Sequence, residues 1–346
     1  MTAFNHGAPG VEWSAESVEP TIPLRPIAPE SPYPSACVSC GGELGIDGYC
    51  LKCGQKAKSL REHYELTPVD WVAGVCDIGL VHAHNEDALA CQASSTRAVV
   101  VVCDGVTTSE ASDVASMAAA QAACTMVWAN NPQGTGTPSS RAAAIEALLT
   151  QAVEAANQAV IEGTDPASHN SAATTIALAL IDDNVVSCVN LGDSRVYWFP
   201  DGGVPCQLSK DHSLAQDGID SGAGRAEAEA SLFAHTITKW LGRDATDLVP
   251  HYATITIDVS GWLVVCTDGL WNFASEASAM SDVIGQCGGE DPTPLDLASR
   301  LVAWANEQGG HDNVTVSCAR LKADTQGVAP SSTESEGPTL PAPIHV

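Results

Sequence analysis

The sequence predicts an α+β fold built from antiparallel β-sheets, and three observations support this prediction. Apolar, strand-like runs recur between residues 98 and 321. The segments "LIDDNVV" and "YWFPDGGVPCQLS" are typical of hairpins, and such short turns can join only antiparallel neighbours. The long helical segments follow each other in the chain instead of alternating with single strands, which argues against a doubly wound sheet.

Seven apolar runs, rich in valine, isoleucine and threonine, predict the strands. They are residues 98–103, 174–181, 185–191, 195–199, 251–258, 262–267 and 313–321. Helical periodicity predicts helices at 109–130, which opens at a serine cap, at 139–163 and at 293–308. The second helix has one apolar stripe, which consists of Ile145, Leu149, Ala152, Val153, Ala156 and Val160.

Composition divides the chain into five segments. Residues 1–36 and 323–346 are rich in proline, serine and glutamate without sustained periodicity, so we expect a disordered arm and a disordered tail. A cysteine-rich patch occupies residues 37–57. We expect a linker at 58–69 and one large domain at 70–322.

The charge balance limits the partners of the protein. Forty-two acidic residues against fifteen basic residues give a net charge of −27, which opposes binding to nucleic acid or to anionic membranes. No apolar run reaches the ~18 residues of a membrane span, and the N-terminus lacks the pattern of a signal peptide. We therefore expect a cytoplasmic protein whose thirteen cysteines are reduced or bind metal.

The segment "CVSCGGELGIDGYCLKCGQ" predicts a zinc ribbon, because it contains two Cys-x-x-Cys-Gly units. Each unit forms a tight knuckle, and two knuckles offer four thiolates to one tetrahedral, structural Zn²⁺. A redox pair needs only one such unit, and free surface cysteines need no matched spacing, so zinc is the preferred interpretation. The expected ligands are Cys37, Cys40, Cys50 and Cys53.

Six acidic residues lie at the ends of apolar runs. Carboxylates that gather in one place repel one another unless they are protonated or bind a hard cation such as Mg²⁺ or Mn²⁺. Taken singly, each of these motifs also fits an ordinary turn or helix cap. The six residues are Glu86, Asp87, Asp104, Asp193, Asp268 and Asp312.

Taken in order, the motifs "GLVHAHNED", "CDGVTT", "GDSR", "TDGLW" and "HDN" resemble those of the metal-dependent protein serine/threonine phosphatases, the PPM or type 2C family, across nearly all of residues 70–322. The resemblance implies two antiparallel sheets packed as a sandwich with helices on both outer faces (α/β/β/α), preceded here by the small zinc ribbon. It implies two Mn²⁺ or Mg²⁺ ions at one end of the sandwich, and a third, weaker ion in many members.

The reaction implied by the resemblance is hydrolysis of phosphoserine and phosphothreonine in proteins by a water that bridges the two metals, without a covalent phosphoenzyme. Phosphorylated proteins, together with a Ser/Thr kinase or its substrates, are the implied partners. Asp104 matches the carboxylate that bridges the metals, with the carbonyl of Gly105 beside it. Asp268 and Asp312 match ligands of one of these metals.

Three further acidic residues also match family positions. Glu86 resembles the residue that holds the other metal through water, and Asp87 lies behind it. Asp193, in "GDSR", matches a ligand of the third ion.

The sequence departs from the family in the residues that grip the substrate. His82 stands where the family usually has an arginine that binds the phosphate, and a histidine cannot offer the same fork of charged donors. If His82 does not contact the phosphate, Arg195 or Lys239 is the alternative cation that binds it. The segments "DGVTT" and "AATT" replace more glycine-rich sequences, and residues 214–235 occupy the place of the family's variable flap.

Two other functions remain open at this point. A catalytically weak, phosphatase-like domain could bind phosphoproteins as a regulatory module, which the histidine and the altered loop favour. A zinc-ribbon adaptor could use the large domain as a scaffold. Retention of all the carboxylates argues against a fully inactive site.

Overall fold

The computed structural model describes residues 33–132 and 136–323. Contacts between residues divide the chain into two compact units, Met1–Ala57 and Lys58–Val346. Most of the expected arm and tail, residues 1–32 and 324–346, lies outside the described residues.

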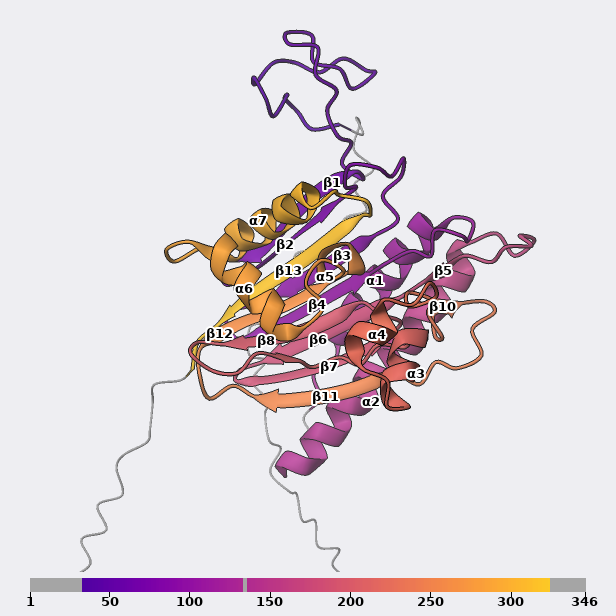
Figure 1. The fold of residues 1–346 in the computed structure, drawn as a ribbon, viewed down its shortest axis with the longest axis vertical. Helices are drawn as coiled ribbons and strands as arrows, with labels where there is room; N and C mark the ends of the chain where they lie inside the picture. Colours follow the sequence, from indigo (N-terminus) through magenta and orange to yellow (C-terminus); the bar gives the residue numbers. More distant parts are fainter. Residues whose placement is uncertain (1–32, 133–135, 324–346) are drawn as a thin grey trace, which may run out of the picture. The chain divides into compact units, whose positions relative to one another are not determined.

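Two antiparallel sheets form the larger unit (Figure 1). The six-stranded sheet has the order β1-β2-β13-β12-β8-β9, with strands His63–Val69, Val72–Asp77, Val314–Leu321, Gly261–Cys266, Arg195–Pro200 and Cys206–Gln207. The five-stranded sheet has the order β11-β7-β6-β4-β3, with strands His251–Thr256, Val185–Leu191, Ile176–Asp182, Arg97–Cys103 and Ala88–Ala93. A separate pair joins β10, Leu241–Gly242, to β5, Ala173–Thr174.

Helices cover the outer face of each sheet (Figure 1). The five-stranded sheet packs against α1 and α2, which are Ser112–Ala129 and Pro138–Gly163. The six-stranded sheet packs against α5, α6 and α7, which are Asp268–Trp271, Ala277–Gly288 and Pro294–Glu307. Two short helices, α3 and α4, occupy Leu214–Asp220 and Arg225–Glu229 in the flap.

Three apolar clusters hold these layers together. One fills the space between the two sheets, one lies under α1 and α2, and one lies under α5, α6 and α7. The expected α/β/β/α sandwich is thereby confirmed. Within the described residues, no helix is both long enough and apolar enough to cross a bilayer.

Local sequence explains where the helices begin, with one correction. Thr137 and Thr293 each accept a hydrogen bond from a backbone N–H of the first turn, and a proline follows each of them. By contrast, α1 begins at Ser112 and not at the expected cap Ser109, because the hydroxyl of Ser109 donates to a carbonyl inside the preceding turn. The residue before this helix, Ala111, has a left-handed backbone with φ 55°.

The segment expected as a linker, 58–69, contains the edge strand β1, which pairs with β2. The hydroxyl of Tyr64 accepts a hydrogen bond from the backbone N–H of Leu89 at 2.7 Å, which ties β1 to β3 as well. At most residues 58–62 therefore remain as a linker. The alternating exposed and half-buried side chains of β1 are polar enough to resemble a loop, which explains the error.

Strand register places the acidic motifs at one end of the sandwich. In the six-stranded sheet, the ends of β2 and β12 lie beside the starts of β13 and β8. In the five-stranded sheet, the ends of β4 and β7 lie beside the starts of β3 and β6. Since the acidic motifs occupy the loops at these strand ends, the fold gathers residues that are far apart in the sequence.

Two glycines allow the backbones at this end to approach closely. A Cβ atom on Gly105 would lie 2.7 Å from the carbonyl oxygen of Glu86, and one on Gly269 would lie 1.9 Å from that of Asn313. A side chain at either position would push apart the segments that bear the acidic residues. The Asp-Gly pairs therefore serve close packing between strand ends, and not only chain reversal.

Candidate functional site

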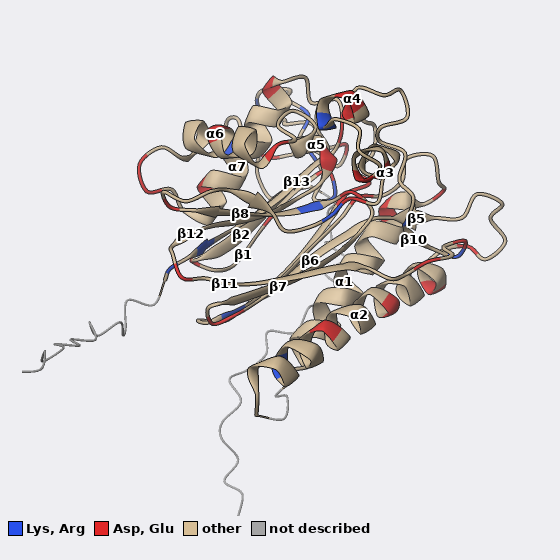
Figure 2. Cartoon of the chain, turned by 60° about the horizontal axis from the view of Figure 1, so that its bottom comes forward, with Lys and Arg blue, Asp and Glu red and all other residues tan. Residues whose placement is uncertain are grey.

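The predicted acidic residues lie at the shared end of the two sheets, where acidic positions gather around α3, α4 and α5 (Figure 2). Asp104, Asp193 and Asp268 follow β4, β7 and β12, whereas Glu86 and Asp312 precede β3 and β13. These strands belong to both sheets. The sandwich, and not any local motif, therefore assembles the cluster.

Asn313 ties the loop that contains Glu86 to the start of β13. Its Oδ1 accepts a hydrogen bond from the Glu86 backbone N–H at 2.7 Å, and its Nδ2 donates to the carbonyls of Ile78 at 2.8 Å and His84 at 3.1 Å. One buried amide thus fixes this loop beside Asp312. The sequence analysis missed Asn313, although a side-chain amide directly after a predicted ligand is a signal that could have identified it.

Two threonines hold the backbone of Asp104. The hydroxyl of Thr174 donates to the Asp104 carbonyl at 2.9 Å, and Oγ1 of Thr175 accepts a hydrogen bond from the Asp104 N–H at 3.1 Å. The Thr175 hydroxyl also contacts that of Ser194, the neighbour of Asp193, at 2.8 Å. The segment "AATT" therefore links two of the acidic loops despite its departure from the family sequence.

Asp87 is buried behind the cluster. It is 1% exposed, and its Oδ2 accepts hydrogen bonds from the hydroxyls of Thr267 and Thr315, each at 2.8 Å. These threonines lie at the end of β12 and near the start of β13. Asp87 therefore holds together the two strand ends that bear Asp268 and Asp312.

Crowding and burial raise the pKa values of several carboxyl groups. Burial, together with the charge of Asp312, raises the pKa of Asp87 to about 8, and burial together with Asp268 raises the pKa of Asp312 to about 6. Burial, followed by neighbouring carboxylates, holds the pKa values of Asp104 and Asp193 well above their ordinary range. Cations in the cluster would supply the charge that keeps these groups ionised.

One further feature suits a divalent cation. Oδ1 of Asp268 is buried and has no hydrogen-bond partner among the described residues, and such an oxygen is a natural ligand for a hard cation. In the described part of the chain, the cysteines are the only group of three or more His, Cys, Asp or Glu side chains that lie close enough to share one ion. Ions at the carboxylates would therefore need water among their ligands.

His82 faces the carboxylate cluster. Its Nε2 lies 3.4 Å from Oδ1 of Asp312, and its Nδ1 lies 3.9 Å from Oε2 of Glu86. The other oxygen of Glu86 accepts a hydrogen bond from the hydroxyl of Ser112, at the start of α1. The His82 side chain is 24% exposed, so it lies at the boundary between the cluster and solvent.

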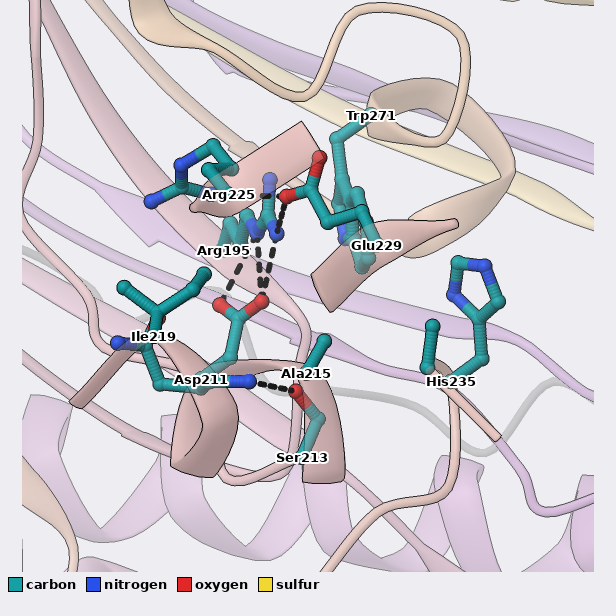
Figure 3. Close-up of a pocket in the computed structure, with 11 residues that line it drawn as sticks. Arg195, Asp211, Ser213, Ala215, Ile219, Arg225, Glu229, His235 and Trp271 are labelled. Carbon is teal, nitrogen blue, oxygen red and sulfur yellow. Dashed lines mark hydrogen bonds and ion pairs between the residues drawn. The ribbon is translucent and has the colours of Figure 1, made fainter. Parts of the chain in front are cut away.

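The two alternative cations for a phosphate already have partners. Arg195 is 2% exposed, donates to Asp211 at 2.6 Å and lies over the ring of Trp271 at 3.5 Å. Figure 3 shows Arg195 directed toward Asp211 in a small cavity lined by residues of the flap. Lys239 pairs with Asp247 at 2.8 Å. These contacts favour His82 over Arg195 and Lys239 as the residue that binds the phosphate.

The smaller unit brings its four cysteine sulfurs together. Sγ of Cys37 lies 3.7 Å from that of Cys53, Sγ of Cys40 lies 3.5 Å from that of Cys50, and all four lie within 4.8 Å of one another. Four thiolates around one zinc, with Zn–S bonds of about 2.3 Å, lie about 3.8 Å apart. The backbone N–H of Cys53 is the main cause that lowers the pKa of Cys50 to about 6, which favours the thiolate form.

Comparison with known proteins gives consistent results. The family model described as protein phosphatase 2C matches residues 81–304. The serine/threonine phosphatase stp of Listeria innocua is 28% identical over 243 residues, which are 69% of this chain and 91% of that protein. The solved serine/threonine phosphatase PstP/Ppp of Mycobacterium tuberculosis is similar with a TM-score of 0.58 and 26% identity, over 72% of this chain and 98% of that one.

A further solved structure shows ions in such a fold. The catalytic domain of PstP in complex with two manganese ions has a TM-score of 0.55 and 25% identity to this chain, over 72% of this chain and 97% of that one. The fold and its relatives thus define a hydrolase of the serine/threonine protein phosphatase class. Since the family model matches more than half of its residues, the chain belongs to the protein phosphatase 2C family.

The raised carboxyl pKa values predict how stability depends on pH without divalent metal. Because Asp87 keeps its proton to about pH 8 in the folded state and only to about pH 4 when unfolded, stability should fall as pH rises between these values. Burial lowers the pKa of His212 to about 4, which opposes this trend only below about pH 6.5. The lowered pKa of Cys50 acts in the opposite direction over this range, but it belongs to the smaller unit. In chelator, the Tm of the larger unit should therefore drop by a few degrees from pH 6.5 to 8.

Added Mn²⁺ should raise the Tm more at pH 8 than at pH 6.5, because it displaces fewer protons at the higher pH. Differential scanning calorimetry measures both quantities. A Tm in chelator that is level or rising over this range would contradict the interpretation of the cluster.

Proposed function

We propose that this protein hydrolyses phosphoserine and phosphothreonine in other proteins with Mn²⁺ or Mg²⁺ as cofactor. The main support is the carboxylate cluster at the shared strand ends, where Oδ1 of Asp268 has no hydrogen-bond partner among the described residues, in a chain of the protein phosphatase 2C family. The names of the relatives support serine/threonine phosphoproteins as substrates, and the manganese complex of PstP supports the cofactor.

The proposal assigns the cations to a few residues. Asp104, Asp268 and Asp312 hold the principal pair, with the carbonyl of Gly105 beside Asp104, and Glu86 acts through water. When bound, the ions activate a water molecule and neutralise charge on the phosphate in the transition state. A third ion, if bound, uses Asp193.

The remaining work falls to the protein's own side chains. Asn313 and Asp87 hold the loops that bear the ligands, so the carboxylates need little rearrangement when substrate arrives. His82 lies at the solvent boundary of the cluster and donates a hydrogen bond to the phosphate. A single imidazole grips a phosphate less firmly than an arginine fork, so we expect weak substrate affinity.

A catalytically weak, phosphoprotein-binding module is the alternative function. His82 in place of an arginine is the observation that favours it. The complete set of carboxylates and the orphaned oxygen of Asp268 favour catalysis instead.

Replacing Asp268 with asparagine should abolish metal-dependent turnover. The change removes the negative charge at the orphaned oxygen, and the loss of transition-state stabilisation by metal should reach several kcal/mol, or roughly a thousandfold in rate. The measurement is hydrolysis of p-nitrophenyl phosphate with Mn²⁺, together with Mn²⁺ affinity by calorimetry. Asp201→Asn, which alters a carboxylate paired with Arg320 at the opposite end of the same sheet, is the matched control. Wild-type turnover by Asp268→Asn would refute the site.

Replacing His82 with arginine should improve substrate binding. The arginine adds a permanent charge and a second hydrogen bond, worth ~1–2 kcal/mol, so KM for a phosphopeptide should drop roughly five- to thirtyfold. Steady-state kinetics measure this change. The control His82→Gln keeps a neutral donor and should not lower KM. An unchanged KM in His82→Arg would show that residue 82 does not contact the phosphate.

We further propose that residues 37–57 form a ribbon around one structural Zn²⁺, and that the catalytic domain comprises the expected residues 70–322 together with the edge strand β1. The four gathered sulfurs support the first point. None of the thirteen cysteines, all within the described residues, forms a disulfide. The ribbon serves docking or regulation, because its cysteines offer four protein ligands and leave no open coordination position for catalysis.

The ribbon proposal predicts about one tightly bound zinc per chain, which Cys50→Ser should lose. A segment this short has almost no apolar core and needs the metal for its folding. Elemental analysis measures the zinc, and turnover of p-nitrophenyl phosphate should stay close to wild type. Cys287→Ser, which alters a cysteine of α6, is the matched control and should keep its zinc. Wild-type protein without zinc would rule the ribbon site out.

A further inference from the structure

Two exposed apolar side chains border the carboxylate cluster. Leu80 is 65% exposed and Val81 is 63% exposed, directly before His82 in the chain. The backbone N–H of Leu80 donates to the carbonyl of Gly310 at 2.9 Å, and Gly310 lies two residues before Asp312. The apolar pair is therefore held at the edge of the cluster by a fixed backbone contact.

Single exposed apolar residues are ordinary on protein surfaces, but this pair has an unusual position. It flanks the residue proposed to contact the phosphate, on a loop that the buried Asn313 side chain holds through two carbonyls. Phe273 adds another partly exposed ring five residues after Asp268, where it packs edge-on against Trp304. A substrate whose phosphate enters the cluster must bring its neighbouring residues close to the Leu80–Val81 pair.

Eleven basic side chains of the larger unit already contact acidic or carbonyl oxygens. From Lys58 to Arg320, every arginine and lysine contacts a carboxylate or a carbonyl oxygen. Those paired with carboxylates are Lys58, Arg141, Arg195, Lys210, Arg225, Lys239 and Arg320. Those bound to carbonyls are Arg61, Arg97, Arg243 and Arg300.

Acidic groups, in contrast, remain open at the edge of the cluster. Glu110, which follows Asp104 in the chain, and Asp217 and Glu227, in the flap helices α3 and α4, are exposed and are not among the proposed metal ligands, in a chain with a net charge of −27. Figure 2 shows acidic positions around α3, α4 and α5 at this end of the sandwich, among basic positions that already have partners. Such a surface attracts positively charged segments and repels acidic ones.

We infer that the preferred substrate is a basic protein segment in which an apolar residue adjoins the phosphorylated serine or threonine. This inference rests on the proposed function. The phosphate occupies the cluster beside His82, the adjoining apolar side chain covers Leu80 and Val81, and the basic residues of the segment face the acidic surface. Shape and apolar contact set the local preference, while charge sets the rate of encounter.

Four phosphothreonine peptides test this inference with Mn²⁺-loaded full-length protein. Leucine or glycine flanks the phosphothreonine on both sides, and the remaining positions contain either lysine or glutamate. We expect kcat/KM to be highest for the leucine–lysine peptide, with at least a tenfold preference for leucine over glycine. The preference for lysine over glutamate should shrink as the salt concentration rises from about 50 to about 500 mM, because the Debye length falls roughly threefold over this range.

Variants assign the leucine preference to the loop. In the double variant Leu80→Ser with Val81→Ser, the ratio of kcat/KM for the leucine peptide to kcat/KM for the glycine peptide should fall to about one. Both values of each ratio are measured on the same protein preparation. Val204→Ser removes another exposed apolar residue, in the β8–β9 hairpin at the opposite end of the sheet, and should keep both the ratio and the activity of wild type.

The possible outcomes separate the inference from the proposed function. Equal turnover of leucine and glycine peptides, or an unchanged ratio in the double variant, overturns the inference while hydrolysis of p-nitrophenyl phosphate still supports the phosphatase. Faster turnover of the glutamate peptides overturns the charge part. If wild type with Mn²⁺ hydrolyses neither p-nitrophenyl phosphate nor any peptide, the proposed function fails, and the inference fails with it.

Discussion

Repulsion among carboxylates gathered at one end of the sandwich is the constraint on which the rest of this structure depends. The fold must hold Asp104, Asp268 and Asp312 near one another, and His82 contacts this cluster only at its solvent boundary. It does so with neutral donors and close backbone contacts: Asn313 fixes the Glu86 loop, and two glycines let strand ends approach within distances that no side chain would permit. Burial, and after it this repulsion, raises the pKa values of Asp87, Asp104 and Asp312.

The three apolar clusters between and outside the sheets supply the rigidity that this arrangement of carboxylates needs. Valine and alanine dominate the strands and helices at their contacts, so the sheets and α1 pack closely along their full length. The catalytic end contributes little to this core, because it is built from loops. A protein organised in this way can hold an electrostatically unfavourable site at a modest cost in stability, which cations then offset.

Apolar runs and short hairpin turns predicted an α+β fold with antiparallel strands and located β4, β6, β7, β8, β11, β12 and β13, whereas the two-sheet sandwich followed from the resemblance to a family. The runs did not include β1, β2 or β3: β1 is a polar edge strand that resembles a loop, and β2 and β3 contain glycine or alanine, which are depleted in strands. The start of α1 was placed at Ser109, since serine is a common cap. The ordered acidic motifs located the candidate site, but only through their resemblance to a family. Periodicity alone cannot show which strand ends meet in space.

The supporting residues were the hardest to predict. Asn313, Thr174 and Thr175 act through single hydrogen bonds across large gaps in the sequence, and each belongs to a residue type that is common in turns and strands. Asp87 was expected behind the metal ligands, yet its bonds to Thr267 and Thr315 depend on the pairing of β12 with β13. Such contacts become visible only when the packing of the two sheets is known.

X-ray diffraction from crystals grown with Mn²⁺, measured at the manganese absorption edge, tests the central claim most directly. The account predicts two strong anomalous peaks at the shared strand ends, with the side chains of Asp104, Asp268 and Asp312 as ligands and with Oδ1 of Asp268 bound to metal. Absence of anomalous density there at saturating Mn²⁺, or peaks confined to other acidic surfaces, would contradict it.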